Sequence, residues 1–299
     1  MSGADRFPVR HTVSGPTGVR VVVHATADPE PGRPVAVLIH GTGYVAQVWE
    51  EILPALAPTH TVLAMDRRGQ GLSDQPAEGY DFVDFADDLC AVIDHFDLAG
   101  AYAVAHSAGA TDALLAAARR PAAFARIFAV EPTVMIPRED VVPDQPLGQI
   151  PSFVLGKVRE RRSEFPDPEQ ARTRLARGSG FAGWRDAPLR AFVEHGLVRR
   201  DGAWHLRCAP STEAAMLLPI FRAMEQSYAN SEIFASLATL RVPVCLASCQ
   251  SSEPVYAPMV TAAEKLLPGL ERTHFATGHC VVQQDPDAFA AAVLRFAES

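Results

Sequence analysis

Cysteine and basic residues are scarce in this chain. Its 299 residues include five cysteines, an odd number, and none has the spacing to a histidine that zinc sites use. Lys and Arg number 27 against 35 Asp and Glu, which gives a formal net charge of −8 and a pI near 5.7. Such an acidic chain is poorly suited to nucleic acid phosphates. The sequence therefore predicts reduced, buried thiols and no nucleic-acid partner.

Long hydrophobic runs and cofactor-binding motifs are also missing. The first ten residues lack the apolar segment of a signal peptide, and no run approaches the length that crosses a membrane. No glycine-rich loop has the P-loop or dinucleotide-binding pattern, and the ten histidines form no closely spaced pair beside acids. We therefore expect a soluble, cytoplasmic protein with no membrane contact, no cofactor and no metal.

Strands and helices alternate along most of the chain. Apolar residues make up 48% of it, as in a packed globular protein. Short apolar or β-branched runs predict strands at Val9–Val13, Val19–Ala25, Pro34–His40, Thr61–Asp66, Ala101–Ala105, Arg126–Val130, Val242–Ala247 and Glu271–Phe275. Helical spacing between Phe82 and Phe96, an Ala-rich run from Ala110 to Arg120, and a capped start at Asp285–Pro286 predict helices. This order predicts an α/β protein with helices on both faces of a mostly parallel sheet.

One segment breaks this alternation. From about residue 136 to 231 there are no strong strand runs, but many charges, prolines and amphipathic stretches such as Pro151–Arg162. We therefore predict an α/β core from residues 1–135 and 232–299, with residues 136–231 inserted as a helical cap. Insertions above such a sheet usually border the ligand crevice, although a second packed domain without a functional role is the alternative.

Ser107 stands where a strand is expected to turn into a helix. Its neighbours Ala105, Ala108 and Gly109 are small, which fits the nucleophile-elbow pattern with one glycine replaced by alanine. Small residues are needed there because the nucleophile occupies strained backbone space between a strand and a helix. An ordinary serine N-cap is the alternative interpretation. We predict that Ser107 is a nucleophile.

Two further loops support that prediction. His40-Gly41-Thr42-Gly43 follows an apolar strand, and its exposed N–H groups are suited to stabilise an oxyanion, with Gly41 and Gly43 lining the substrate site. His279 follows the last predicted strand, from which it reaches the carboxyl edge of the sheet as a general base. Alone, it would more simply be a histidine on a surface loop.

The acid that orients the histidine has two candidates. Glu131 ends the strand Arg126–Val130, and Glu253 follows the strand Val242–Ala247. Either could be a solvated loop residue. A carboxylate that ends a buried strand beside Pro132 needs a partner, because burying an unpaired charge is costly. We therefore favour Glu131 and keep Glu253 as the second candidate.

The chain resembles the α/β-hydrolase superfamily over nearly its whole length. The motifs that carry the resemblance are His40-Gly41-Thr42-Gly43, Asp66-Arg67-Arg68-Gly69-Gln70-Gly71-Leu72-Ser73-Asp74, Ala105-His106-Ser107-Ala108-Gly109 and Gly278-His279. The resemblance implies an eight-stranded, mostly parallel sheet. It also implies Ser107 as nucleophile, His279 as base and the backbone N–H groups of Thr42 and Ala108 as oxyanion donors.

The resemblance also bears on the acid. Many family members carry it in a Gly-x-x-Asp motif after the seventh strand, where this chain has Cys249 and Ser252. Zearalenone lactonases and one subgroup of haloalkane dehalogenases place a glutamate after the sixth strand, and Glu131-Pro132-Thr133 is similar to that arrangement.

A serine nucleophile excludes the alkyl chemistry that aspartate nucleophiles perform in dehalogenases and epoxide hydrolases of this fold. It indicates attack on a carbonyl, followed by release of the acyl-enzyme by water. We expect a serine hydrolase of a small, partly apolar carboxylic ester or lactone. The alternatives are a C–C bond hydrolase or perhydrolase using the same triad, and a small-molecule receptor with slow turnover.

Other residues have predicted roles at the pocket. His106 lines it, donates a local hydrogen bond, or occupies a position without a specific role. Trp184, Trp204, Phe181 and Met224 either form its wall, with Trp184 the preferred candidate, or pack inside the cap. A homodimer is compatible with the sequence, which carries no signal for the oligomeric state.

Overall fold

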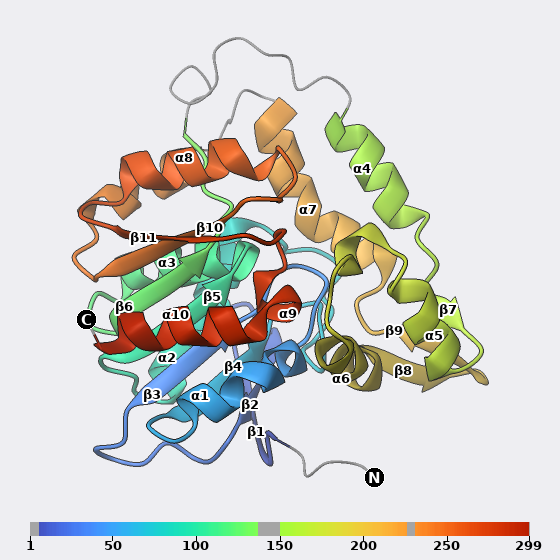
Figure 1. Cartoon of the computed structure of the whole chain (residues 1–299), viewed down its shortest axis with the longest axis horizontal. Coiled ribbons are helices and arrows are strands. Elements are labelled where there is room, and N and C mark those ends of the chain that lie inside the picture. The colour runs from blue at the N-terminus through green and yellow to red at the C-terminus, as the bar shows by residue number, and fades with distance from the viewer. Residues whose placement is uncertain (1–5, 137–149, 226–230, 299) are drawn as a thin grey trace.

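The structure, a computed structural model, describes residues 6–136, 150–225 and 231–298. Eight strands form one sheet in the order β1-β2-β4-β3-β5-β6-β10-β11 (Figure 1). They are β1 (Val9–Ser14), β2 (Arg20–Ala25), β3 (Val35–Ile39), β4 (Thr61–Asp66), β5 (Ala101–His106), β6 (Phe124–Val130), β10 (Val244–Cys249) and β11 (Glu271–Phe275). Only the β1–β2 and β2–β4 pairs are antiparallel. The predicted mostly parallel eight-stranded sheet is confirmed.

Helices cover both faces of this sheet, as predicted. On one face lie α2 (Phe82–His95), α3 (Ala108–Arg119) and α8 (Tyr256–Leu266); on the other lie η1 (Ala46–Ile52), α1 (Leu53–Leu56) and α10 (Pro286–Glu298). Successive side chains along one strand point to opposite faces of the sheet. Ala103 and Ala105 of β5 pack in the first cluster, whereas Tyr102 and Val104 pack in the second. Burial on both faces is the reason that these strands read as continuous apolar runs.

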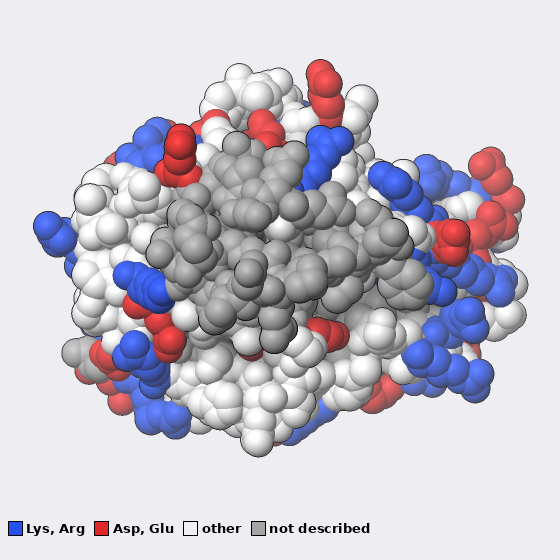
Figure 2. Space-filling view, turned by 90° about the horizontal axis from the view of Figure 1, so that it is seen from above, with Lys and Arg blue, Asp and Glu red and all other residues white. Residues whose placement is uncertain are grey.

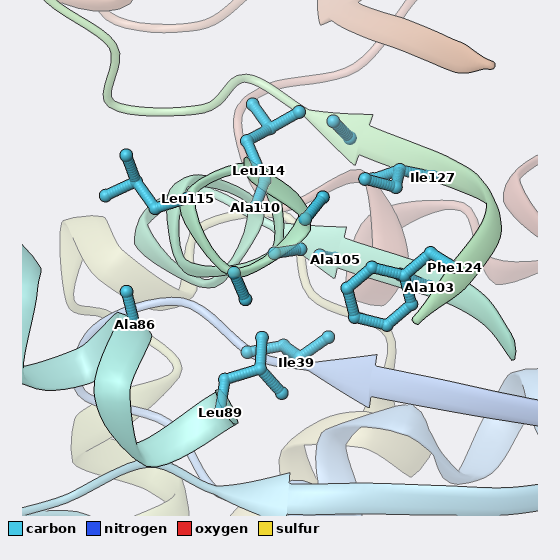
Figure 3. Packing of buried hydrophobic residues seen from close by; sticks show 14 of the residues in the cluster. Ile39, Ala86, Leu89, Ala103, Ala105, Ala110, Leu114, Leu115, Phe124 and Ile127 are labelled. Carbon is cyan, nitrogen blue, oxygen red and sulfur yellow. The ribbon is translucent and has the colours of Figure 1, made fainter. Parts of the chain in front are cut away.

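Helix α3 approaches the sheet very closely. Figure 3 shows small side chains, among them Ala105 and Ala110, between the helix and the strands beneath it. At Gly109 a Cβ atom would lie 2.5 Å from the carbonyl oxygens of both Ile39 and His40. The glycine therefore allows the helix to rest on the backbone of β3, directly after Ser107.

A second group of elements lies beside the sheet (Figure 1). It contains the helices α4 (Ile150–Arg159), α5 (Pro168–Leu175), η3 (Ser179–Phe181), α6 (Asp186–Gly196) and α7 (Pro210–Glu225). It contacts the loop after β3 and the short helix α9 (Val281–Gln284): the Tyr44 hydroxyl donates to the Gly180 carbonyl at 3.0 Å, and Gln284 donates to the Ala182 carbonyl at 2.7 Å. These elements fall within the predicted cap, 136–231, of which residues 137–149 and 226–230 lie outside the described residues.

This group also contains a small antiparallel sheet that the sequence analysis did not expect. Its strands are β7 (Glu164–Phe165), β8 (Leu197–Arg200) and β9 (Ala203–Leu206), in the order β7-β9-β8. Asp201 and Gly202 connect β8 to β9 with φ angles of 51° and 83°. An Asp-Gly pair with both φ angles positive is the usual two-residue hairpin turn. That dipeptide was the signal in the sequence for this hairpin.

Charged side chains are intermixed on the surface rather than separated by sign. Figure 2 shows acidic and basic side chains side by side around the face seen from above. Several form exposed ion pairs, such as Arg172 with Asp186 at 2.9 Å and Arg120 with Asp94 at 2.7 Å. Among the helices of the described residues, none has the length and apolar character needed to span a bilayer.

The close approach at Gly109 generates a prediction. Gly109→Ala forces α3 away from β3, and we expect the free energy of unfolding to fall by about 1–3 kcal/mol, the usual cost of overpacking. Chemical denaturation measures this change. Gly180→Ala is the control, because a Cβ there meets no atom within 4 Å, and we expect a change within about 0.5 kcal/mol. Equal stability of the two variants would contradict the packing argument.

Candidate active site

Four loops meet at the carboxyl edge of the large sheet. His40–Gly43 follows β3, Ser107 follows β5, Glu131 follows β6 and His279 follows β11. Strands β3, β5, β6, β10 and β11 are parallel neighbours, so the residues after them emerge at the same edge. This arrangement brings together residues that are far apart in the sequence.

Ser107 is held in a strained backbone conformation. Its φ is 56° and its ψ is −127°, and α3 begins at the next residue. The Ser107 N–H still donates to the Val130 carbonyl of β6 at 2.8 Å, so the chain leaves the sheet abruptly at this residue. Such a conformation costs about 1–3 kcal/mol and persists only where the surroundings enforce it. The turn leaves Ser107 9% exposed at the rim of the sheet.

Glu131 makes the same kind of turn at the end of β6. Its φ is 40°, and its N–H donates to the Ala247 carbonyl of β10 at 2.9 Å. The carboxylate is only 2% exposed and accepts three hydrogen bonds. They come from the Cys249 N–H at 2.8 Å, the Ser252 hydroxyl at 2.6 Å and His279 Nδ1 at 2.7 Å. Three donors compensate the burial of the charge.

Glu253, the second candidate for the acid, is not the carboxylate that pairs with His279. It is exposed, and no hydrogen bond or ion pair joins its carboxylate to His279 in the described part of the chain. Cys249 and Ser252 stand where the usual motif has glycine and aspartate, and their bonds to Glu131 were not predicted from the sequence. The signal in the sequence was Ser252, a serine at the position of the usual aspartate. Its hydroxyl donates to the carboxylate of Glu131, which follows the neighbouring strand β6.

The His279 ring is fixed on several sides. Because Nδ1 donates to Glu131, Nε2 is the nitrogen left for proton exchange. The ring stacks on Tyr256 with centroids 3.7 Å apart and planes at 13°. The backbone is held as well: the Gly278 N–H donates to Gln284 at 2.8 Å, and the His279 carbonyl accepts from His106 Nε2 at 2.8 Å.

The loop after β3 lies against the nucleophile. A Cβ on Gly41 would lie 3.1 Å from Ser107 Cβ, so only glycine fits without a shift. Across the described residues, the backbone N–H groups of Thr42 and Ala108 have no hydrogen-bond acceptor. The Ala108 N–H stands at the start of α3 and the Thr42 N–H in the loop after β3, and N–H groups without an acceptor are suited to bind an oxyanion.

Gly43 is placed differently from Gly41. Its N–H donates to the Gln70 side chain at 2.6 Å, so this N–H already has an acceptor within the protein. A Cβ at this position would meet the carboxylate of Glu213 at 3.3 Å. Glu213 is a buried residue of α7 that is ion-paired with Arg161, and burial raises its pKa. The direct contact with Ser107 therefore comes from Gly41.

His40 supports this loop from below. Its Nδ1 donates to the Gly41 carbonyl at 2.8 Å, and its Nε2 accepts from the Arg67 N–H at 3.3 Å. Arg67 in turn pairs with the buried Asp112 of α3 at 2.6 Å. Burial lowers the pKa of His40 to about 4, so the ring is neutral near pH 7.

Two of the aromatic candidates, Trp184 and Phe181, form a cluster with Tyr44. The Tyr44 ring lies 5.1 Å from Trp184, 6.1 Å from Phe181 and 6.4 Å from His106. Trp184 is thus linked to the site through Tyr44. Phe181 and Met224 are buried in the hydrophobic clusters, as the packing interpretation expects, and Trp204 is partly buried on β9.

His106 is 1% exposed, and its Nε2 is bound to the His279 carbonyl. Of the roles considered for it, this geometry matches the local hydrogen-bond donor. Among the residues that the structure describes, no group of three His, Cys, Asp or Glu side chains is arranged to hold a metal ion.

Comparison with known proteins identifies the family of this chain. The alpha/beta hydrolase family matches residues 36–292. The chain belongs to this family. The predicted membership of the superfamily is confirmed, and the resemblance to zearalenone lactonases in particular stays a prediction.

Similar proteins include chains named as hydrolases or esterases. The chain is 25% identical to 2-(acetamidomethylene)succinate hydrolase of Mesorhizobium japonicum over 267 residues, which cover 89% of this chain and 88% of that protein. A crystal structure of E-2-(acetamidomethylene)succinate hydrolase superposes with a TM-score of 0.78 at 21% identity, covering 97% of this chain and 99% of that one. A bifunctional esterase/perhydrolase of Acinetobacter calcoaceticus is 31% identical over 136 residues, 44% of this chain and 49% of that protein.

The bond between Glu131 and His279 generates a prediction about activity. Glu131→Gln removes the carboxylate that fixes the imidazole tautomer, and we expect kcat for ester hydrolysis to fall by about 10³–10⁴-fold. Glu253→Gln is the matched control and should change kcat only mildly. Steady-state kinetics with p-nitrophenyl esters compare the two, and the reverse ranking would transfer the role to Glu253.

Burial of His40 generates a prediction about acid stability. Its folded pKa of about 4 lies below its unfolded value near 6.5, so the unfolded chain binds a proton first as the pH falls. The contribution of His40 to the free energy of unfolding is therefore fully present above pH 6.5 and is lost as the pH falls. At pH 5 the free energy of unfolding is lower by about 2 kcal/mol because of this group. His40→Asn does not titrate, so it should lose correspondingly less stability between pH 7 and pH 5. Urea denaturation at both pH values measures this, and identical declines would refute the assignment.

Proposed function

We propose that this chain is a cofactor-free serine hydrolase that cleaves a carboxylic ester or lactone through an acyl-enzyme. The observation that carries the proposal is the 2.7 Å hydrogen bond between buried Glu131 and His279 Nδ1 at the same sheet edge as the strained Ser107. A buried carboxylate, an oriented imidazole and a hydroxyl on an elbow are the parts that acyl transfer needs.

The proposed reaction proceeds in two halves. In the first, the Ser107 hydroxyl attacks the substrate carbonyl while His279 Nε2 takes its proton. Glu131 accepts the Nδ1 hydrogen bond and stabilises the imidazolium, and the N–H groups of Thr42 and Ala108 bind the oxyanion. His279 then returns the proton to the leaving alkoxide, and Ser107 remains acylated.

In the second half, water replaces the alcohol. His279 takes a proton from water while the water oxygen attacks the acyl carbonyl. Collapse of the intermediate breaks the bond to Ser107 Oγ and releases the acid, and His279 returns the proton to Ser107 Oγ. Low exposure of Ser107 and of the His279 side chain, 9% and 11%, favours this chemistry because few waters compete with the donors.

A partly apolar substrate fits this environment. Tyr44, Trp184 and Phe181 form an aromatic cluster that contacts His106, next to the nucleophile. Tyr256 adds a further aromatic ring on His279. Aromatic rings of this kind bind apolar groups while tolerating polar edges.

Amide hydrolysis is the second candidate. It is favoured by the similarity over 89% of the chain to a protein named for an acetamido substrate. The same triad would serve, because His279 would protonate a leaving nitrogen instead of an alkoxide. Matched ester and amide pairs that share one acyl group discriminate the two by their kcat/KM values.

Covalent labelling tests the proposal. We expect a fluorophosphonate probe to label the wild-type chain at Ser107, and peptide mass spectrometry locates the labelled residue. We also expect the wild-type chain to hydrolyse p-nitrophenyl esters. Ser107→Ala should abolish labelling and lower kcat by about 10⁴–10⁶-fold, because the nucleophile is absent. Labelling without turnover of any ester, lactone or amide would favour the receptor alternative. Absence of labelling in the folded wild-type chain would refute the nucleophile.

A further inference from the structure

His106 joins the nucleophile to the base. We infer that it is a positioning residue, whose imidazole ties the His279 loop to the strand that carries Ser107. The inference deepens the proposed function and rests on it. His106 is the last residue of β5, so its backbone directly precedes Ser107, while its Nε2 donates to the His279 carbonyl at 2.8 Å. The side chain of His106 thus connects the segments that carry Ser107 and His279, the two residues that exchange a proton in the proposed reaction.

The surroundings of His106 fix its ring tightly. It is 1% exposed, and its centroid lies 4.6 Å from that of His279. The Tyr44 ring stacks parallel to it within 15°, with centroids 6.4 Å apart. On the remaining side, its Nδ1 would lie 3.2 Å from a Cβ on Gly41. The ring is therefore packed between the base loop and the oxyanion loop.

The protonation state suits a single donated bond. Burial lowers the pKa of His106 well below its usual value, so the ring is neutral. A neutral imidazole carries one N–H, and the short contact to the carbonyl assigns it to Nε2. His106 therefore adds no positive charge beside His279, where the imidazolium must form during the reaction.

The other hydrogen bonds of the loop after β11 do not hold the His279 carbonyl. The Ser251 N–H donates to the Thr277 carbonyl at 2.8 Å, and the Gly278 N–H donates to Gln284. These bonds hold the residues before His279. In the described part of the chain, the bond from His106 is the one that holds the carbonyl of His279 itself. The ring is anchored to Glu131 and the backbone to His106, so the two bonds together set where Nε2 points.

The hydrogen bond can be removed without removing the ring. His106→Phe keeps an aromatic ring but has no donor, and a displacement of the base by about 1 Å costs about 100-fold in rate. We expect kcat and the rate of fluorophosphonate labelling to fall by about 10–100-fold, with KM within about two-fold. His106→Gln retains an N–H at a similar distance and should recover most of both rates. His274→Gln, a change at an exposed histidine of β11, is the control and should leave both rates unchanged.

Amide hydrogen exchange provides a readout that does not depend on activity. We expect faster exchange at residues 276–280 in His106→Phe than in His106→Gln or the wild type, because the loop has lost a restraint. Should the phenylalanine variant fail to fold, His106→Leu takes its place in both measurements.

The outcomes separate this inference from the proposed function. Wild-type rates and exchange in a folded His106→Phe or His106→Leu variant would overturn it. So would a raised KM with unchanged kcat, which would make His106 a substrate contact. A wild-type chain that neither labels nor hydrolyses would overturn the proposed function first, whatever the exchange data show.

Discussion

The burial of one carboxylate organises the site. Glu131 is almost inaccessible to water, and its charge is tolerated because an N–H, a hydroxyl and an imidazole all donate to it. These donors come from residues at or after the ends of β10 and β11, while the carboxylate follows β6. A single charged group therefore ties three strand ends together. The need to satisfy it determines where His279 lies.

Close packing of backbones is the second constraint. Ser107 occupies a strained conformation that an isolated turn would not keep, and the cost is offset by the packing around it. Gly109 lets α3 rest on β3, and Gly41 lets the neighbouring loop touch Ser107. Both glycines are needed because their neighbours leave no room for a Cβ atom. The same closeness brings free backbone N–H groups next to the serine.

Buried side chains hold the loops around the site. His40 holds Gly41 and Arg67, Arg67 holds Asp112 on α3, and His106 holds the carbonyl of His279. Each of these groups is buried, and burial keeps both histidines neutral. Neutral rings act as fixed hydrogen-bonding parts and do not disturb the charge that the proposed reaction creates.

The sequence by itself determined the large sheet, the strand ends and the residue types at them, because buried parallel strands and strand-to-helix turns leave local patterns. It left two acids open, since Glu131 and Glu253 both follow apolar strands. Only the tertiary structure decided where they lie, because which carboxylate reaches His279 depends on the lateral order of β6, β10 and β11, and that order has no local signature. For the same reason the sequence did not show that Cys249 and Ser252 donate to Glu131, or that the acceptor of the His106 hydrogen bond is the His279 carbonyl. The small sheet β7-β9-β8 was overlooked for another reason: its Asp-Gly turn was a local signal, but its strands are short and half-polar.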